Sequence, residues 1–214
     1  MFVWLWVFLI AGTAHSKNVA RLDNEVPQQC QPGKWRDLKN ESQVLKGLSQ
    51  IVKRKGARLE VHPKQGAAWI FRDAKTPGAD LAQHRVVAVA PDQSWVTLFE
   101  PAFDSTHYRL LFLKSRQDIE LSGCPLWSPD GQHFVTLNED LESGQTVNEV
   151  SLWSCVAPHK FCESVWHLDV GGRNVHWTAD GRAVLLVSHL NEHGDAQTAT
   201  LECQIEGPCS QPKW

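Results

Sequence analysis

Acidic and histidine side chains gather in and beside three stretches, 100–106 (with Asp104), 138–146 and 189–197, that could bind a metal ion, because carboxylate and imidazole groups are common ligands of divalent cations. Four of these residues are our candidate ligands: Glu139, Asp140, His189 and His193. The His-x-x-x-His spacing joins two ligands only on a helix, whereas Gly194 places this segment in a loop. Exposed loops are ordinarily polar. The sequence therefore favours solvated loops over a metal site, and we predict no cofactor.

Motifs for catalysis are absent from the sequence. It contains no G-x-S-x-G nucleophile elbow, no H-E-x-x-H zinc motif and no glycine-rich phosphate loop. The net charge of −3 gives no signature of polyanion binding, so we do not expect a nucleic-acid partner. These observations favour a protein that binds over one that catalyses.

One sequence motif recurs along the chain, and the strands that it predicts must position these loops. It occurs at 126–137 and 175–186, and more loosely at 89–98. Asp-Gly between two apolar runs predicts a tight hairpin, because glycine adopts the positive φ that such turns need. Proline pre-sets φ for a turn and cannot donate to a sheet. The predicted turn residues are Pro91, Asp92, Pro129, Asp130, Gly131, Asp180 and Gly181.

The stretch Trp127–Gly131 reads Trp-Ser-Pro-Asp-Gly and resembles the PD40 (WD40-like) repeat of TolB-type β-propellers. Trp177–Gly181 matches this repeat at its Trp, Asp and Gly, and the copy at 91–93 keeps only Pro-Asp. The resemblance extends from about Val86 to the C-terminus. It implies an all-β, propeller-like fold and packing roles for Trp127 and Trp177, although both could instead offer a ligand-stacking surface.

The predicted elements form three four-stranded blades, a degenerate first blade and one N-terminal helix. The blades have strands near 86–90, 94–99, 107–113 and 116–121, then 125–128, 132–138, 147–154 and 162–168, then 174–177, 182–188, 196–203 and 208–213. A hairpin of 57–61 with 67–71 is the degenerate blade. The helix covers 40–55, since Val44, Leu45, Leu48, Ile51 and Val52 would share one face. Lys53, Arg54 and Lys55 would form its solvated basic end, which we favour over a binding patch.

Six cysteines in a chain with an export signal indicate an oxidising compartment. Two pairs flank the turns between the third and fourth strands of the last two blades, where opposed residues lie within disulfide reach. We therefore predict the bridges Cys155–Cys162 and Cys203–Cys209 and, by elimination, Cys30–Cys124.

Residues 1–16 form an apolar stretch with small residues at its end, which predicts a cleaved signal peptide. The run is shorter than the roughly 20 residues of a membrane span, so we expect no stable span after cleavage. Residues 17–56 would form a lead-in and the helix, and residues 57–214 the propeller-like domain. Asn40 begins a glycosylation sequon, whose use the sequence does not decide.

These patterns together predict a secreted or periplasmic, disulfide-bonded, non-catalytic binding module with a protein partner. Two alternatives stay open: a protein that binds a small ligand or metal ion through the acidic and histidine loops, and a hydrolase or lyase that uses a central pocket. Few blades are predicted for a closed propeller. The ring could close compactly, stay open, or be completed by another chain, and we favour one of the first two.

Overall fold

The computed structural model describes residues 45–46, 48–73, 84–90, 92–101, 106–144, 146–156, 161–205, 207 and 209–210. These residues form four antiparallel sheets. Sheet A contains β1 (Val52–Lys55), β2 (Arg58–Val61) and β3 (Trp69–Arg72); sheet B contains β4 (Arg85–Val89), β5 (Trp95–Pro101), β6 (Thr106–Phe112) and β7 (Asp118–Leu121); sheet C contains β8 (Leu126–Trp127), β9 (His133–Asn138), β10 (Glu149–Val156) and β11 (Phe161–Leu168); sheet D contains β12 (Gly171–Trp177), β13 (Ala183–Leu190) and β14 (Ala196–Cys203).

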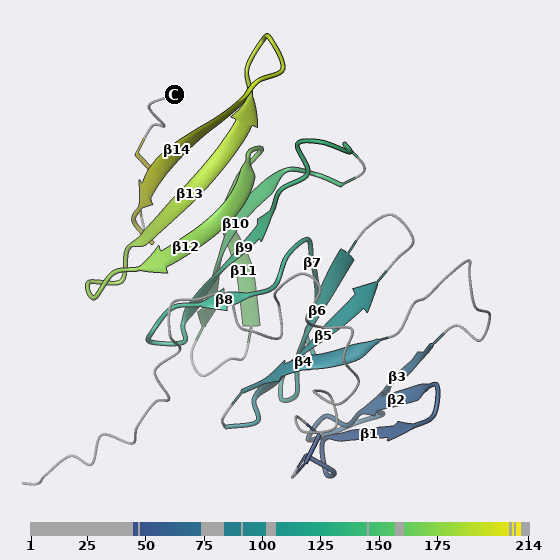
Figure 1. Ribbon diagram of the computed structural model, residues 1–214. Coiled ribbons are helices and arrows are strands. Elements are labelled where there is room, and N and C mark those ends of the chain that lie inside the picture. The colour runs from purple at the N-terminus through teal and green to yellow at the C-terminus, as the bar shows by residue number, and fades with distance from the viewer. Residues whose placement is uncertain are drawn as a thin grey trace, which may run out of the picture.

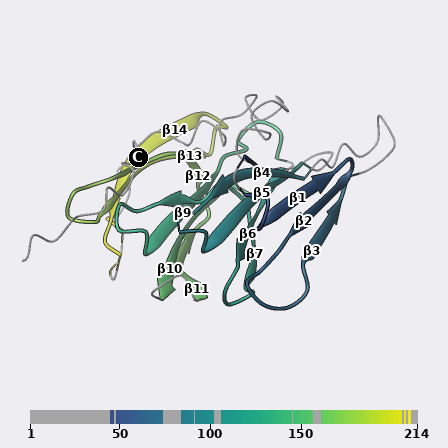
Figure 2. The same cartoon turned by 90° about the horizontal axis from the view of Figure 1, so that it is seen from below.

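The sheets follow one another across the molecule in chain order, with sheets A and D at opposite ends (Figures 1 and 2). Within each sheet, strands that are consecutive in sequence are neighbours in space. Three apolar clusters fill the junctions between A and B, between B and C, and between C and D. The fold is all-β and propeller-like, and its described part is an open row of blades rather than a closed ring.

Alternation along the strands explains why the two middle sheets can pack on both sides. In β5, Val96 and Leu98 lie in the cluster shared with sheet A, whereas Trp95 and Phe99 lie in the cluster shared with sheet C. Successive side chains of a strand point to opposite faces, so a strand that is apolar at nearly every position must be covered twice. This packing holds each sheet in a fixed orientation against its neighbours.

In sheets C and D each repeated turn is closed by hydrogen bonds of a side-chain hydroxyl, an arrangement called here the hydroxyl clamp. Ser128 Oγ donates to Asp130 Oδ1 at 2.6 Å and accepts a bond from His133 N at 3.0 Å. In sheet D, Thr178 Oγ1 donates to Asp180 Oδ1 at 2.5 Å and accepts a bond from Arg182 N at 2.9 Å. The glycine that follows each aspartate has a positive φ, as the Asp-Gly sequence predicts.

Sheet B carries a weaker version of this turn. Ala90 replaces the hydroxyl residue, and Gln93 stands at the glycine position with φ of 58°. Asp92 Oδ1 instead accepts bonds from Ser94 N and Ser94 Oγ, at 3.1 and 2.7 Å. The turn of sheet B thus keeps a similar shape although its sequence differs from that of the other two. Pro91 lies outside the described residues.

Most predicted strands are confirmed, with two corrections. The helix predicted over 40–55 is wrong where the structure describes it, since Leu48 and Ile51 lie in turns and Val52–Lys55 is β1. Pairing of β1 with β2 provides backbone partners that outweigh the helical periodicity, and it places the predicted domain boundary at residue 56 inside a hairpin.

In sheet D the fourth strand predicted at 208–213 is reduced, within the described residues, to a bridge between Cys203 and Cys209.

Candidate functional site

Strand order gives the row of sheets two distinct faces. The turns β4–β5, β6–β7, β8–β9 and β12–β13 lie on one side, called here the turn face. The β9–β10 and β13–β14 connections lie on the other side, called the loop face, together with the end of β5 and the start of β6. The acidic and histidine stretches of the sequence therefore belong to the loop face. Residues 102–105, which include Asp104, lie outside the described residues.

The β9–β10 loop is organised around the carboxylate of Asp140. Its oxygens accept bonds from Ser143 N at 2.9 Å, Gly144 N at 3.2 Å and Thr146 N at 2.7 Å. The hydroxyls of Ser143 and Thr146 donate to the same carboxylate. Because these internal donors surround both oxygens, Asp140 fixes the shape of the loop rather than offering a vacant ligand.

Glu139 is used in a similar way, as a tie between sheets C and D. Its carboxylate accepts bonds from Arg173 Nε at 2.7 and 2.9 Å and from the hydroxyl of Ser188. A Cβ added at Gly171 would lie 2.9 Å from Glu139 Cγ, so the glycine leaves room for this side chain to cross β12. The pair fastens the β9–β10 loop to the next sheet.

The two remaining candidate ligands belong to the β13–β14 hairpin. His189 is paired with Gln197 at the end of the ladder, and His193 is exposed in the turn, where its N–H donates to Asn191 Oδ1 at 2.9 Å. Across the described parts of the chain, no three His, Cys, Asp or Glu side chains converge as metal ligands. Glu139 and Asp140 thus make separate structural contacts, and the described residues do not bring them together with His189 and His193 as one metal site.

A chain of ionic contacts that sequence reasoning missed joins sheets A and B. Asp73 accepts bonds from Arg54 Nη1 at 2.9 Å and from His84 N at 2.9 Å, and the His84 ring lies between Asp73 and Glu100. Arg109 then bridges Glu100 and Asp118. Partial burial alone would lower the pKa of Arg109, but the charges and hydrogen bonds of Glu100 and Asp118 together outweigh it and hold that pKa above its usual value. These residues are far apart in sequence, and only the packing of two sheets brings them together.

A second grouping contains the residue types of a nucleophilic hydrolase. Ser151 Oγ lies 3.1 Å from His167 Nδ1, and His167 Nε2 lies 2.7 Å from Asp169 Oδ1. However, Ser151 is only 2 % exposed, and its hydroxyl donates to Glu149 Oε1 at 2.5 Å. A nucleophile must reach its substrate and must direct its proton to the histidine, whereas Ser151 is buried and directs its proton to Glu149. The geometry therefore describes a partly buried polar contact between β10 and β11.

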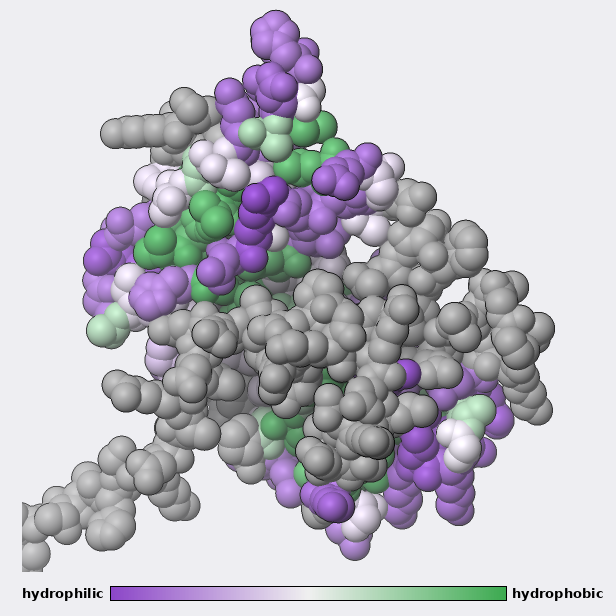
Figure 3. Space-filling model, in the orientation of Figure 1, coloured by the Kyte–Doolittle hydropathy of each residue, from purple (hydrophilic) through white to green (hydrophobic). Residues whose placement is uncertain are grey.

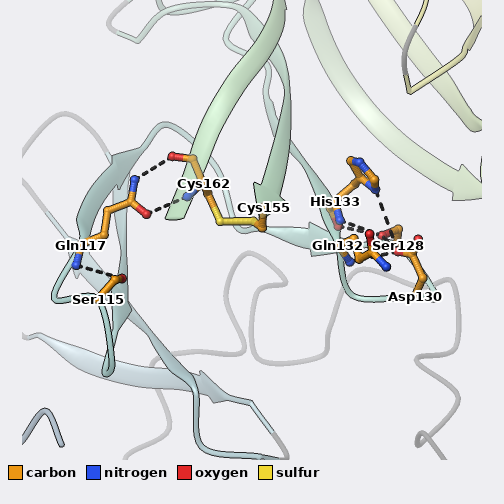
Figure 4. The surroundings of a disulfide bond; sticks show 8 residues. All are labelled: Ser115, Gln117, Ser128, Asp130, Gln132, His133, Cys155 and Cys162. Carbon is orange, nitrogen blue, oxygen red and sulfur yellow. Dashed lines mark hydrogen bonds and ion pairs between the residues drawn. A yellow bond between two sulfur atoms is a disulfide. The ribbon is translucent and has the colours of Figure 1, made fainter. Parts of the chain in front are cut away.

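The turn face is held together by disulfides and by one bidentate amide. The predicted bridges Cys155–Cys162 and Cys203–Cys209 are present, with Cα atoms 4.0 and 3.9 Å apart. Gln117 of sheet B accepts a bond from Cys162 N at 2.7 Å and donates to Cys162 O at 2.6 Å (Figure 4). Cys124 is also disulfide-bonded. Cys30, its predicted partner, lies outside the described residues.

The repeat tryptophans do not form an exposed stacking surface. Trp127 and Trp177 are 9 % and 6 % exposed. Trp127 stacks on Trp95 at a centroid distance of 5.0 Å and also contacts Phe134, while Trp177 Nε1 donates to Leu126 O at 3.2 Å. Both side chains fill junctions between sheets, which is the packing role that the repeat implied.

Searches against known protein families and against curated proteins find no match. Solved structures similar to this chain include the following two. A 6-phosphogluconolactonase-like protein from Bacteroides fragilis is 13% identical over 69% of this chain and 52% of its own, with a TM-score of 0.33. One from Bacteroides uniformis is 12% identical over 69% of this chain and 68% of its own, with a TM-score of 0.32. The matched part of this chain thus spans about half the length of the first structure.

No helix in the described segments is long and apolar enough to cross a lipid bilayer.

Proposed function

We propose that this protein is an exported binding module that recognises a protein partner through its loop face. The observation that carries the proposal is the state of Asp140, whose carboxylate is surrounded by donors of its own loop. A loop that is already ordered loses little conformational entropy on binding, which favours its use for recognition. The same hydrogen bonds argue against the alternative use of Asp140 as a metal ligand.

The ordered loop presents an apolar residue to solvent. Val147 is 63% exposed, the largest exposed fraction among the large apolar side chains that the structure describes. It directly follows Thr146, one of the residues bound to Asp140, and Asn138 Nδ2 donates to the Val147 carbonyl. An exposed apolar side chain on a fixed backbone is the kind of anchor that protein interfaces bury. We infer that Val147 lies at the centre of the recognised surface.

Export is supported by the covalent chemistry of the chain. The cysteines described by the structure are all bridged. Disulfides persist in secreted and periplasmic proteins and are rare in reducing compartments. Together with the apolar stretch at residues 1–16, this supports a secreted or periplasmic location. The resemblance of the Trp-Ser-Pro-Asp-Gly repeat to TolB-type propellers supports the same proposal.

Site-specific photo-crosslinking tests the function. A photoreactive amino acid at position 147 is expected to capture one defined protein in the native compartment. The same amino acid at Leu186, an exposed residue of sheet D, serves as the matched control and should not capture that protein. Asp140→Ala should weaken capture at least tenfold while the disulfides stay intact. Equal capture from both positions, or none from position 147, would contradict the proposal.

A further inference from the structure

The outer face of sheet A, which faces away from sheet B, is strongly basic. Leu59 and Val61 of β2 are buried against sheet B, so the alternate positions of the sheet point outward. These outward positions hold four cations, one carboxylate and one apolar residue: Lys53, Lys55, Arg58, Arg72, Glu60 and Ile70. The face thus has a net charge of +3 in a protein whose overall charge is −3. Figure 3 shows the hydrophilic surface over this sheet, at the lower right.

Three of these cations form a single row across the sheet. Lys55 is paired with Arg58, and Arg58 is paired with Arg72. Neighbouring strands are about 4.8 Å apart, and like charges directly opposite one another destabilise a sheet. The only carboxylate of the face lies in the next row, where Glu60 Oε1 is 2.7 Å from Arg58 Nε. The row is therefore arranged for an external anion rather than for stability.

The positive groups Arg58 and His62 act on the carboxyl group of Glu60. Burial alone would raise the pKa of the Glu60 carboxyl, but the charges of Arg58 and His62 and their hydrogen bonds outweigh that effect and lower it. His62 Nε2 lies 3.1 Å from Glu60 Oε2, so a further basic group borders the patch. One carboxylate between an arginine and a histidine leaves the positive charge of the face uncompensated.

Ile70 distinguishes this patch from an ordinary solvated surface. It is 49% exposed and occupies the row of Lys53 and Glu60, beside the row of three cations. A flat sheet face with several Lys and Arg around one apolar side chain fits a plane of anionic head groups, into which the apolar residue can insert. An acidic peptide is the competing occupant, because arginine clusters also bind acidic side chains, but it gives no reason for the exposed apolar Ile70 among the cations.

We propose that the outer face of sheet A docks on a membrane surface that contains anionic phospholipid. The Lys55–Arg58–Arg72 row contacts the phosphates, and Ile70 enters the head-group layer. Arg54 takes no part, because its side chain points to the other side of β1 and pairs with Asp73. This surface lies at the end of the row of sheets, so docking leaves the loop face open to a protein partner.

Vesicle co-sedimentation of the full-length mature protein tests this proposal. We expect binding to vesicles of phosphatidylcholine with phosphatidylglycerol, no binding to phosphatidylcholine alone, and weaker binding as salt rises. Each cation near such a surface contributes a factor of about 5, so Lys55→Ser, Arg58→Ser and Arg72→Ser together should lower the partition coefficient about 100-fold. Lys114→Ser, on the β6–β7 turn, is the single-charge control for Lys55→Ser and should change binding little.

Two further results separate docking from a folding defect. Glu60→Gln removes the only negative charge of the face and should strengthen binding to anionic vesicles about 5-fold without creating binding to phosphatidylcholine alone, whereas a damaged fold that exposes apolar surface would bind both. Lys55→Ser relieves repulsion, so it should lower binding without lowering the melting temperature. The proposal is wrong if the triple variant binds vesicles like the wild type. Binding to poly-glutamate but not to anionic vesicles would identify an acidic protein segment as the partner and would also overturn it.

Discussion

Sheets B and D of the row differ in how many faces they bury. Sheet B carries apolar residues on both faces, with Val96 toward sheet A and Phe99 toward sheet C. Sheet D buries Leu185 against sheet C, whereas Leu186, on its other face, is 39% exposed. The rest of the outer face of sheet D is mostly polar: Asn174, His176, Thr198, Thr200 and Glu202. Repeat arrays end in units with a polar outer face, and sheet D has this character.

The two end sheets also differ from each other. The outer face of sheet A is basic, while that of sheet D is largely uncharged and its Glu202 pairs with Arg182. Each of these outer faces exposes one side of a sheet to water, but they do so with different side chains. Only the outer face of sheet A places like charges opposite one another, which indicates a role beyond solubility.

Truncation of two neighbouring leucines gives the largest expected effect and tests the contrast between the faces of sheet D. Leu185→Ala should lower the free energy of unfolding by about 2–5 kcal/mol, because it leaves a cavity between sheets C and D. Leu186→Ala should cost less than about 1 kcal/mol, since its side chain is partly solvated. Urea denaturation measures both. Equal losses would mean that the outer face of sheet D is covered in solution.

Removal of the Gln117 amide tests how firmly the inner sheets are joined. Gln117→Ala should lower the free energy of unfolding by about 1–3 kcal/mol, because it removes the partner of both backbone groups of Cys162. Ser115→Ala is the matched control in the same turn, since its contact with Gln117 N is long, at 3.4 Å, and exposed. If both variants lose the same stability, the amide does not join sheets B and C.

Exchange of turn residues compares the repeat of sheet B with that of sheet C. Gly131→Ala should destabilise the protein by about 1 kcal/mol, because φ of 68° strains a residue with a Cβ. Gln93→Gly should have the opposite sign and stabilise by up to about 1 kcal/mol, since φ of 58° is then relaxed, although glycine also makes the unfolded chain more flexible. Thermal unfolding of both variants checks the signs. A destabilised Gln93→Gly variant would show that the glutamine side chain supports its turn.

Acid sensitivity is the smallest expected difference and concerns the clamped turns of sheets C and D. The Thr178 hydroxyl bond lowers the pKa of Asp180, despite some desolvation. For Asp130, burial raises the pKa, but bonds from Ser128 and Gln132 N outweigh it, so the value is again lowered. A carboxyl whose pKa is lowered in the folded state stabilises the fold at pH values above the ordinary aspartate pKa of about 3.9. This stabilisation is lost as the pH falls through the folded-state pKa.

Unfolding midpoints at pH 7 and pH 3 test this assignment. Asp180→Asn and Asp130→Asn should each reduce the loss of stability between the two pH values. Asp195→Asn, in the β13–β14 turn, is the control for the loss of one surface carboxylate, and the Asp180 and Asp130 variants should differ from it. An unaltered pH dependence in the first two variants would contradict the role of the hydroxyl clamps.

Local turn chemistry made much of the fold predictable. Asp-Gly at 130–131 and 180–181 marks turns that depend on a few neighbouring residues, and the strands around them follow from apolar alternation. The cysteine pairs were predictable for the same reason, because both partners lie on one hairpin. The helix predicted at 40–55 fails where it meets sheet A, since the periodic residues Leu48 and Ile51 pack into the same core from turns.

The candidate sites were less predictable because they depend on contacts between sheets. Asp73, His84 and Glu100 meet only when sheet A packs on sheet B. The basic face was hidden for a similar reason. Read as a helix, Lys53 and Lys55 are part of a solvated end, but in β1 they share a face with Arg58 and Arg72 of the two strands beside it.

Fluorescence from the two ends of the molecule shows whether the two end faces differ in function. An environment-sensitive fluorescent amino acid is placed at position 70 in one variant and at position 186 in another, and vesicles containing phosphatidylglycerol are added. We expect a blue shift at position 70 and none at position 186. A shift at position 186, or at neither position, would mean that the outer face of sheet A is not a specific membrane-binding surface.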